Sequence, residues 1–130
     1  MFDWFAKMTA GEARQLSPVT LAFVGDAVYS LYIRERVLKE GDARLAELQK
    51  RTTAYVSAKG QSELLNKLES AFNCEEEDIY RRGRNAKKST KSKNASVADY
   101  NRSTGLEAVL GYLWLSGQYE RIYSLLEGAL

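Results

Sequence analysis

Two segments of this chain carry large apolar residues on nearly every side of a helix, and they constrain the fold more than any other feature. The first is LAFVGDAVYSLYI, from Leu21 to Ile33, and the second is LEAVLGYLWL, from Leu106 to Leu115. A helix that is apolar on most sides is a central helix, with other elements packed around it. The sequence therefore predicts a domain built around two buried helices.

Helix boundary signals flank the first segment. Ser17 followed by Pro18 is typical of a helix start, with the serine as N-cap and the proline in the first helical position, and Gly41 is a suitable stop. One apolar face at helical spacing consists of Leu21, Val24, Val28, Leu31 and Tyr32. Much of the remaining surface is covered by Ala22, Phe23, Tyr29 and Ile33. The charged last turns, 34–39, are expected to emerge into solvent.

The rest of the chain also reads as helical. Residues 42–70 indicate two helices with a break near Ser57 to Gly60, and Asn73 followed by Glu76 is an N-cap pattern for a further helix. Residues 86–99 are polar and loop-like, and helices are expected from about 103 to 115 and from 119 to 130. No useful strand-like alternation is present. We predict an all-α fold of about six to seven helices, forming a single domain over residues 1–130, a length that suits one domain.

Each central helix carries one acid and one glycine, which are Asp26 and Gly25 in the first and Glu107 and Gly111 in the second. If the helices cross, the glycines allow a close approach and the two carboxylates face each other. Such a pair repels unless a cation or a shared proton lies between the groups. The chain has no histidine and one cysteine, so a hard cation, Mg²⁺ or Mn²⁺, is the natural candidate. The alternative is that each acid points to solvent or pairs with one of the 19 Lys and Arg residues.

Positive charge is concentrated in RRGRNAKKSTKSKN, residues 81–94, which holds seven basic residues and no acid. The remainder of the chain has 12 basic and 17 acidic residues and is net negative. A concentrated basic segment suits the phosphates of nucleic acid, and its lack of aromatics favours a duplex backbone over stacked single strands. A solvated loop is the alternative, and Arg81 and Arg82 also suit a helix C-terminus. The candidate RNA-binding residues are Arg81, Arg82, Arg84, Asn85, Lys87, Lys88, Lys91 and Lys93.

Several of these stretches resemble the catalytic domain of the ribonuclease III family. LAFVGDAVYSLYIRERVL is similar to the signature helix of that domain, and LEAVLGYLWL is similar to its later acidic helix. VSAKGQSELL, RRGRNAK and YNRSTGLEAVLGYL, in this order, resemble the compact bacterial branch, which lacks a double-stranded-RNA-binding domain. The resemblance runs from about residue 16 onward and implies a ribonuclease III-like helical endonuclease domain.

The resemblance also implies a function. It indicates a cytoplasmic, homodimeric, Mg²⁺-dependent endoribonuclease, with Mn²⁺ as a substitute, that cuts double-stranded RNA and leaves 5′-phosphate and 3′-hydroxyl ends. In the compact branch the expected substrate is 23S ribosomal RNA precursor, cut at both ends, with a ribosomal protein as a possible helper. By position, Asp26 and Glu107 fall on catalytic, metal-binding acids. Val19, Ala22 and Thr104 stand where the wider family has further acids.

Two other readings stay open at this point. One is a non-catalytic protein with a ribonuclease III-like fold that binds structured RNA, for which the reduced set of acids is the argument. The other is a helical interaction protein whose basic loop contacts an acidic protein. The N-terminal MFDWFAKM lacks the long apolar core of an export signal, and no segment is long and apolar enough to span a membrane. We therefore expect a cytoplasmic protein without a membrane partner.

Overall fold

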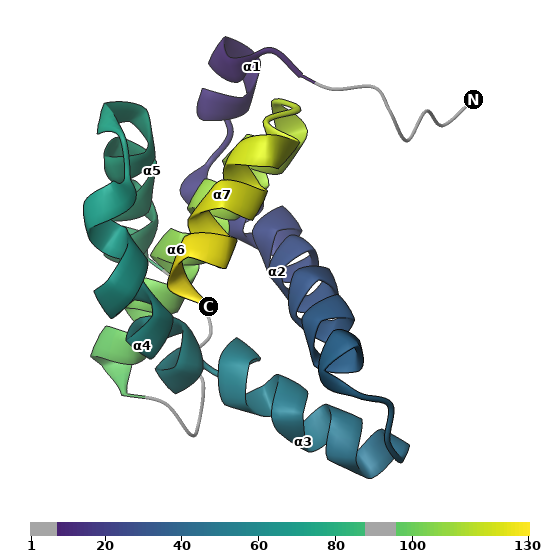
Figure 1. Cartoon of the computed structure of the whole chain (residues 1–130). Coiled ribbons are helices and arrows are strands. Elements are labelled where there is room, and N and C mark those ends of the chain that lie inside the picture. The colour runs from purple at the N-terminus through teal and green to yellow at the C-terminus, as the bar shows by residue number, and fades with distance from the viewer. Residues whose placement is uncertain (1–7, 88–95) are drawn as a thin grey trace.

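The computed structural model describes residues 8–87 and 96–130, and all regular structure in these ranges is helical (Figure 1). The predicted all-α fold of six to seven helices is confirmed for these residues. They form seven α-helices and one short 3-10 helix: α1 (Ala10–Arg14), α2 (Pro18–Glu40), α3 (Leu45–Val56), α4 (Ala58–Leu68), η1 (Glu69–Ala71), α5 (Cys74–Asn85), α6 (Val97–Leu115) and α7 (Tyr119–Ala129).

Short polar residues and glycine fix the helix ends where the sequence predicts them. The Ser17 hydroxyl accepts a hydrogen bond from the backbone N–H of Thr20 at 3.1 Å and so caps α2. Gly41 ends that helix with φ of 143°, in the region that glycine adopts without a Cβ penalty. Ser57 separates α3 from α4, and its hydroxyl accepts from the N–H of Gly60 at 3.1 Å.

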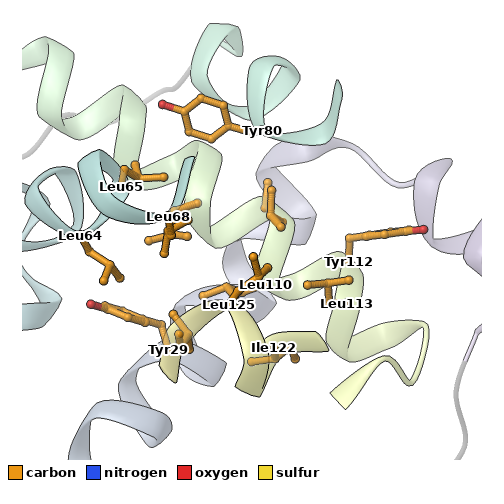
Figure 2. Packing of buried hydrophobic residues seen from close by; sticks show 14 of the residues in the cluster. Tyr29, Leu64, Leu65, Leu68, Tyr80, Leu110, Tyr112, Leu113, Ile122 and Leu125 are labelled. Carbon is orange, nitrogen blue, oxygen red and sulfur yellow. The ribbon is translucent and has the colours of Figure 1, made fainter. Parts of the chain in front are cut away.

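Helix α6 lies at the centre of the fold. Residues 103–106 and 108–113 are all buried, and α1, α2, α4, α5 and α7 all pack against this helix. Figure 2 shows buried side chains of α2, α4, α5 and α7 packed along α6, with Leu125 of α7 beside Leu110. Within residues 8–87 and 96–130, no helix is both long enough and apolar enough to cross a lipid bilayer.

The face of α2 that packs inward differs from the apolar face that was predicted from the spacing of its sequence. Its buried residues recur mainly every fourth position, as Leu21, Gly25, Tyr29, Ile33 and Val37, with Ala22 beside them. By contrast, Leu31 is 55% exposed and Phe23 is 81% exposed. The buried stripe is the one that contains a glycine, because α6 crosses α2 there at very short range. Of the apolar face predicted from spacing, Leu21 is buried, Val24, Val28 and Tyr32 are half-buried, and Leu31 is exposed.

Two helical segments extend beyond the predicted ranges. Helix α6 begins at Val97 rather than near residue 103, because Ser96 caps it by accepting from the N–H of Asp99 at 3.1 Å. Helix α1 is a short element that begins with a reciprocal capping box between Thr9 and Glu12. Neither segment carries a run of large apolar residues at helical spacing, so their caps were the clearest local sign of helix.

A buried ion pair ties α5 to α7. Glu76 caps α5 together with Asn73, as predicted, yet it is only 1% exposed. The guanidinium of Arg121 holds it from α7, with Nε donating to Oε2 and Nη2 to Oε1, both at 2.8 Å. Nη2 also donates to the backbone oxygen of Ala71 at 2.7 Å. The charge of Glu76 is therefore balanced and hydrogen-bonded inside the protein, as a buried carboxylate requires.

Candidate active site

Two glycines set the crossing of α2 and α6. A Cβ atom added to Gly25 would lie 1.7 Å from the backbone oxygen of Glu107, and one added to Gly111 would lie 1.9 Å from the backbone oxygen of Leu21. Neither space admits a side chain, so the two backbones touch directly. Glycine weakens a helix interior, and this contact explains why both helices nevertheless contain one. The role of Gly25 is therefore close helix packing.

The same crossing brings the two lone acids together. Asp26 follows Gly25 in α2, while Glu107 is the residue of α6 whose backbone Gly25 contacts. Burial raises the pKa of Glu107 from 4.5 to about 8; a hydrogen bond from Gln61 opposes this shift, and the charge of Asp26 adds to it. Asp26 itself is exposed.

The described residues test the two alternatives for these acids, which are exposure to solvent and pairing with a lysine or arginine. Among residues 8–87 and 96–130, neither Asp26 nor Glu107 forms an ion pair with a lysine or arginine. Asp26 does reach solvent, whereas Glu107 is mostly covered and faces another carboxylate. The two carboxylates are thus paired with each other, and the pair is open to solvent on the side of Asp26.

Gln61 is a third member of this cluster, and the sequence reasoning missed it. Its side-chain Nε2 donates to Oε2 of Glu107 at 3.1 Å and to the backbone oxygen of Val56 at 3.0 Å. Gln61 is only 2% exposed. One sequence signal could have indicated it, because Gln61 is a polar residue on the stripe of Leu64, Leu65 and Leu68 that α4 buries.

The carboxylate pair has the donor chemistry of a Mg²⁺ site. Among the residues with described positions, no three His, Cys, Asp or Glu side chains gather closely enough to enclose a metal ion. Mg²⁺ needs no such cage, because it keeps several waters and binds through one or two carboxylates. Thr104 adds no acid, and its hydroxyl donates back to the Tyr100 carbonyl at 3.0 Å. Asp26 and Glu107 therefore fit Mg²⁺ better than a four-ligand structural zinc site.

The raised pKa of Glu107 predicts how the metal-free protein depends on pH. Folding stability from this group is fully present below the ordinary value of 4.5 and is lost as pH rises to about 8, because the folded state holds the proton more tightly. In EDTA at pH 8, we expect Glu107→Gln to be more stable than the wild type by roughly 1–3 kcal/mol, and nearly equal to it at pH 4.5. Denaturant unfolding across this range measures the difference, and a constant difference would contradict the shift.

The candidate RNA-binding residues begin at the last turn of α5. Arg81 pairs with Asp78 at 3.0 Å, and Arg82 donates to the backbone oxygen of Arg14 at 3.3 Å, so both have partners within the fold. The guanidinium of Arg84 lies over the Tyr80 ring, 5.7 Å from its centroid. Asn85 and Lys87 are exposed. Lys88, Lys91 and Lys93 lie outside the described residues.

The end of α5 lies close to the turn of α6 that carries Glu107. A Cβ added to Gly83 would lie 2.9 Å from Cα of Gly105 and 3.1 Å from Cβ of Ala108. This close contact places the start of the basic segment beside residues 105–108. The structure thus places the start of the basic segment against α6, within one helical turn of Glu107 along the chain.

Comparison with known proteins defines the class. A family model of the ribonuclease III domain matches residues 19–118, a range that contains both Asp26 and Glu107. The chain belongs to the ribonuclease III family, and it is an endoribonuclease of that family. Enzymes of this family typically use Mg²⁺ and act on double-stranded RNA.

Within the family, this chain is similar to bacterial Mini-ribonuclease 3 proteins, which confirms the predicted resemblance to the compact branch. One from Thermoanaerobacter sp. is 47% identical over 86% of this chain and 79% of its own length. Another, from Symbiobacterium thermophilum, is 45% identical over 88% of both chains. A crystal structure of a protein from Fusobacterium nucleatum superposes with a TM-score of 0.80 at 33% identity, covering 88% of this chain and 93% of the other.

Proposed function

We propose that this chain is a Mg²⁺-dependent endoribonuclease, with Mn²⁺ as a substitute, that cleaves double-stranded RNA, and that Asp26 and Glu107 are its catalytic residues. The observation that carries this proposal is the pairing of the two acids at the glycine crossing, where burial and the charge of Asp26 both act on Glu107. A divalent cation between the carboxylates would relieve their repulsion. The whole chain, residues 1–130, would act as one catalytic domain.

The proposed chemistry divides between the cation and the side chains. A Mg²⁺ ion held by Asp26 and Glu107 would supply a water of lowered pKa and would neutralise charge that develops at the phosphate. Asp26 would hold the open side of the site, since it is exposed, while Glu107 would form the buried side. Attack of water on phosphorus would form a new P–O bond and break the bond between phosphorus and O3′. The water loses a proton and O3′ gains one, which leaves a 5′-phosphate and a 3′-hydroxyl. No histidine base is needed, which agrees with a chain that has none.

The proposed substrate is 23S ribosomal RNA precursor, cut to give its mature 5′ and 3′ ends in the bacterial cytoplasm. Support comes from the resemblance to the Mini-ribonuclease 3 proteins. A ribosomal protein bound to the precursor is a possible helper. The test compares a plain RNA duplex with the precursor, each with and without Mg²⁺, and with end-group analysis of the products. Metal-independent binding without cleavage would instead favour a non-catalytic RNA-binding protein.

The basic segment is proposed as a clamp on the RNA backbone. We expect joint replacement of Lys87, Lys88, Lys91 and Lys93 by alanine to weaken duplex binding and to flatten its salt dependence. The slope of log K against log salt should fall by roughly one for each lysine that contacts a phosphate. Binding titrations without Mg²⁺ at several salt concentrations measure the slope. An unchanged slope would show that these lysines do not contact the RNA.

A homodimer is proposed from the outward face of α2 and α7. An apolar groove there is lined by Phe23, Leu31, Trp114 and Tyr123, and it also includes Asp26. Contiguous exposed apolar surface of this kind marks an interaction site. A second copy on this groove would cover the exposed side chains and place the two acidic sites near one interface.

The dimer is tested by placing a charge in the groove. We expect Phe23→Asp to convert a wild-type dimer at micromolar concentration to a folded monomer, because Phe23 lines the groove and is 81% exposed in the single chain. Leu38→Asp is the matched control, since Leu38 is 55% exposed on the same helix but does not line the groove. Sedimentation equilibrium measures both. A monomeric wild type would contradict the proposal.

A further inference from the structure

We propose that Gln61 is a positioning residue of the site, which fixes the Glu107 carboxylate in the orientation that pairs it with Asp26. The inference rests on the proposed function, because it gives Gln61 a task only if Glu107 holds the cation. The sequence alone did not single out this residue. Its contacts and its burial carry the argument.

The hydrogen bonds of Gln61 define one orientation of its amide. Both partners of the side chain, Oε2 of Glu107 and the carbonyl of Val56, are acceptors. Only the NH₂ group of an amide can serve two acceptors, so a flipped amide would set oxygen against oxygen at both contacts. The orientation is therefore dictated by its surroundings.

This orientation leaves a polar atom unsatisfied. Oε1 of Gln61 is buried and has no hydrogen-bond partner among the described residues. Buried polar atoms are nearly always paired, and an exception needs an explanation. A residue selected only for packing between α4 and α6 would avoid this arrangement, since leucine fills a similar space without an orphaned acceptor. The polar contact with Glu107 is the feature that leucine would lose.

The anchor of Gln61 is the end of a helix. Val56 is the last residue of α3, and its carbonyl has no partner from within that helix because the helix ends there. Gln61 lies in the first turns of α4, immediately after the Ser57 break, and is 2% exposed. One Nε2 thus joins the α3–α4 corner to the acid of α6. Supporting hydrogen bonds of this kind orient metal ligands and are commonly worth 10–100-fold in affinity or activity.

The test removes the donor and keeps the volume. We expect Gln61→Met to lower kcat on a plain RNA duplex by about 10–100-fold and to weaken Mn²⁺ binding, measured by calorimetry without RNA, by a similar factor. KM for the duplex should stay within about twofold, because Gln61 is buried and does not reach the RNA. Gln61→Leu tests a second apolar side chain that also lacks a hydrogen-bond donor. Thermal unfolding verifies that each variant is folded.

Ser62→Ala is the matched control. Ser62 is the next residue of α4, is 6% exposed, and also bonds to α6, where it accepts from Arg102 rather than donating to Glu107. We expect this variant to keep wild-type kcat and Mn²⁺ affinity. If it loses as much as Gln61→Met, or if Gln61→Met matches the wild type, the positioning role is wrong.

Asp26→Asn, measured in the same series, separates the two possible failures. If Asp26→Asn is inactive while Gln61→Met cleaves and binds Mn²⁺ normally, only the role of Gln61 is overturned. If Asp26→Asn still cleaves the duplex, the proposed site itself is wrong, and the inference about Gln61 is overturned with it.

Discussion

Asp26→Asn and Glu107→Gln should each lower cleavage of double-stranded RNA by about three orders of magnitude or more. The two carboxylates supply the only acidic pair at the α2–α6 crossing, and no third acid lies close enough among the described residues to replace either one. Metal-assisted hydrolysis gains several kcal/mol from the cation, and each 1.36 kcal/mol is tenfold in rate. Single-turnover cleavage of a plain duplex at saturating Mg²⁺ measures the loss.

Both substitutions preserve side-chain shape, so both variants are expected to fold and to bind RNA as the wild type does, with Glu107→Gln more stable than the wild type in metal-free buffer at pH 8. Far-UV circular dichroism, thermal unfolding and duplex binding without Mg²⁺ provide that control. Glu120→Gln is a matched variant, since Glu120 is an exposed acid in the first turn of α7, and it should cleave normally. Retained cleavage by either Asp26→Asn or Glu107→Gln would remove that acid from the catalytic pair.

Arg121→Ala should destabilise the protein by about 3–5 kcal/mol, the largest stability effect that we expect from removing one charged side chain. The substitution leaves the carboxylate of Glu76, 1% exposed, without the two 2.8 Å bonds that now balance it. An uncompensated buried charge is costly, and the attachment of α7 to α5 is lost at the same time. Urea unfolding at pH 7 measures the change.

Arg14→Ala provides the contrast. Its ion pair with Glu75 has a similar distance, 3.2 Å, but the side chains are 46% and 52% exposed. Exposed pairs contribute about 0–1 kcal/mol, because water screens them and solvates either partner alone. If the two arginine variants lose the same stability, burial is not what makes the Glu76–Arg121 pair important.

Local chemistry explains which parts of the fold could be predicted. The bounds of α2 follow from the Ser17 cap and from Gly41. Both signals can be recognised from a few neighbouring residues. The pairing of Asp26 with Glu107 was also accessible, since two apolar helices that each contain one glycine are expected to cross at those glycines. In both cases the residues that determine the structure are themselves unusual in the sequence.

Other features depend on contacts between residues far apart in the chain, which local sequence patterns do not indicate. The buried stripe of α2 was decided by which face α6 approaches. Of the apolar face predicted from spacing, Leu21 is buried, Val24, Val28 and Tyr32 are half-buried, and Leu31 is exposed. Gln61 bonds to a carboxylate 46 residues away, and nothing near it in the chain indicates that partner. The Arg121 contact with Glu76, 45 residues apart, was hidden in the same way.

The central claim is that Asp26 and Glu107 together hold the divalent cation of this endoribonuclease. The most direct measurement is anomalous X-ray scattering from crystals of the wild-type protein soaked in Mn²⁺. We predict an anomalous peak between the two carboxylates, within direct coordination distance of at least one of them, and no such peak in crystals of the Glu107→Gln variant at the same Mn²⁺ concentration. An ordered Mn²⁺ bound elsewhere, with the space between Asp26 and Glu107 empty, would contradict the account.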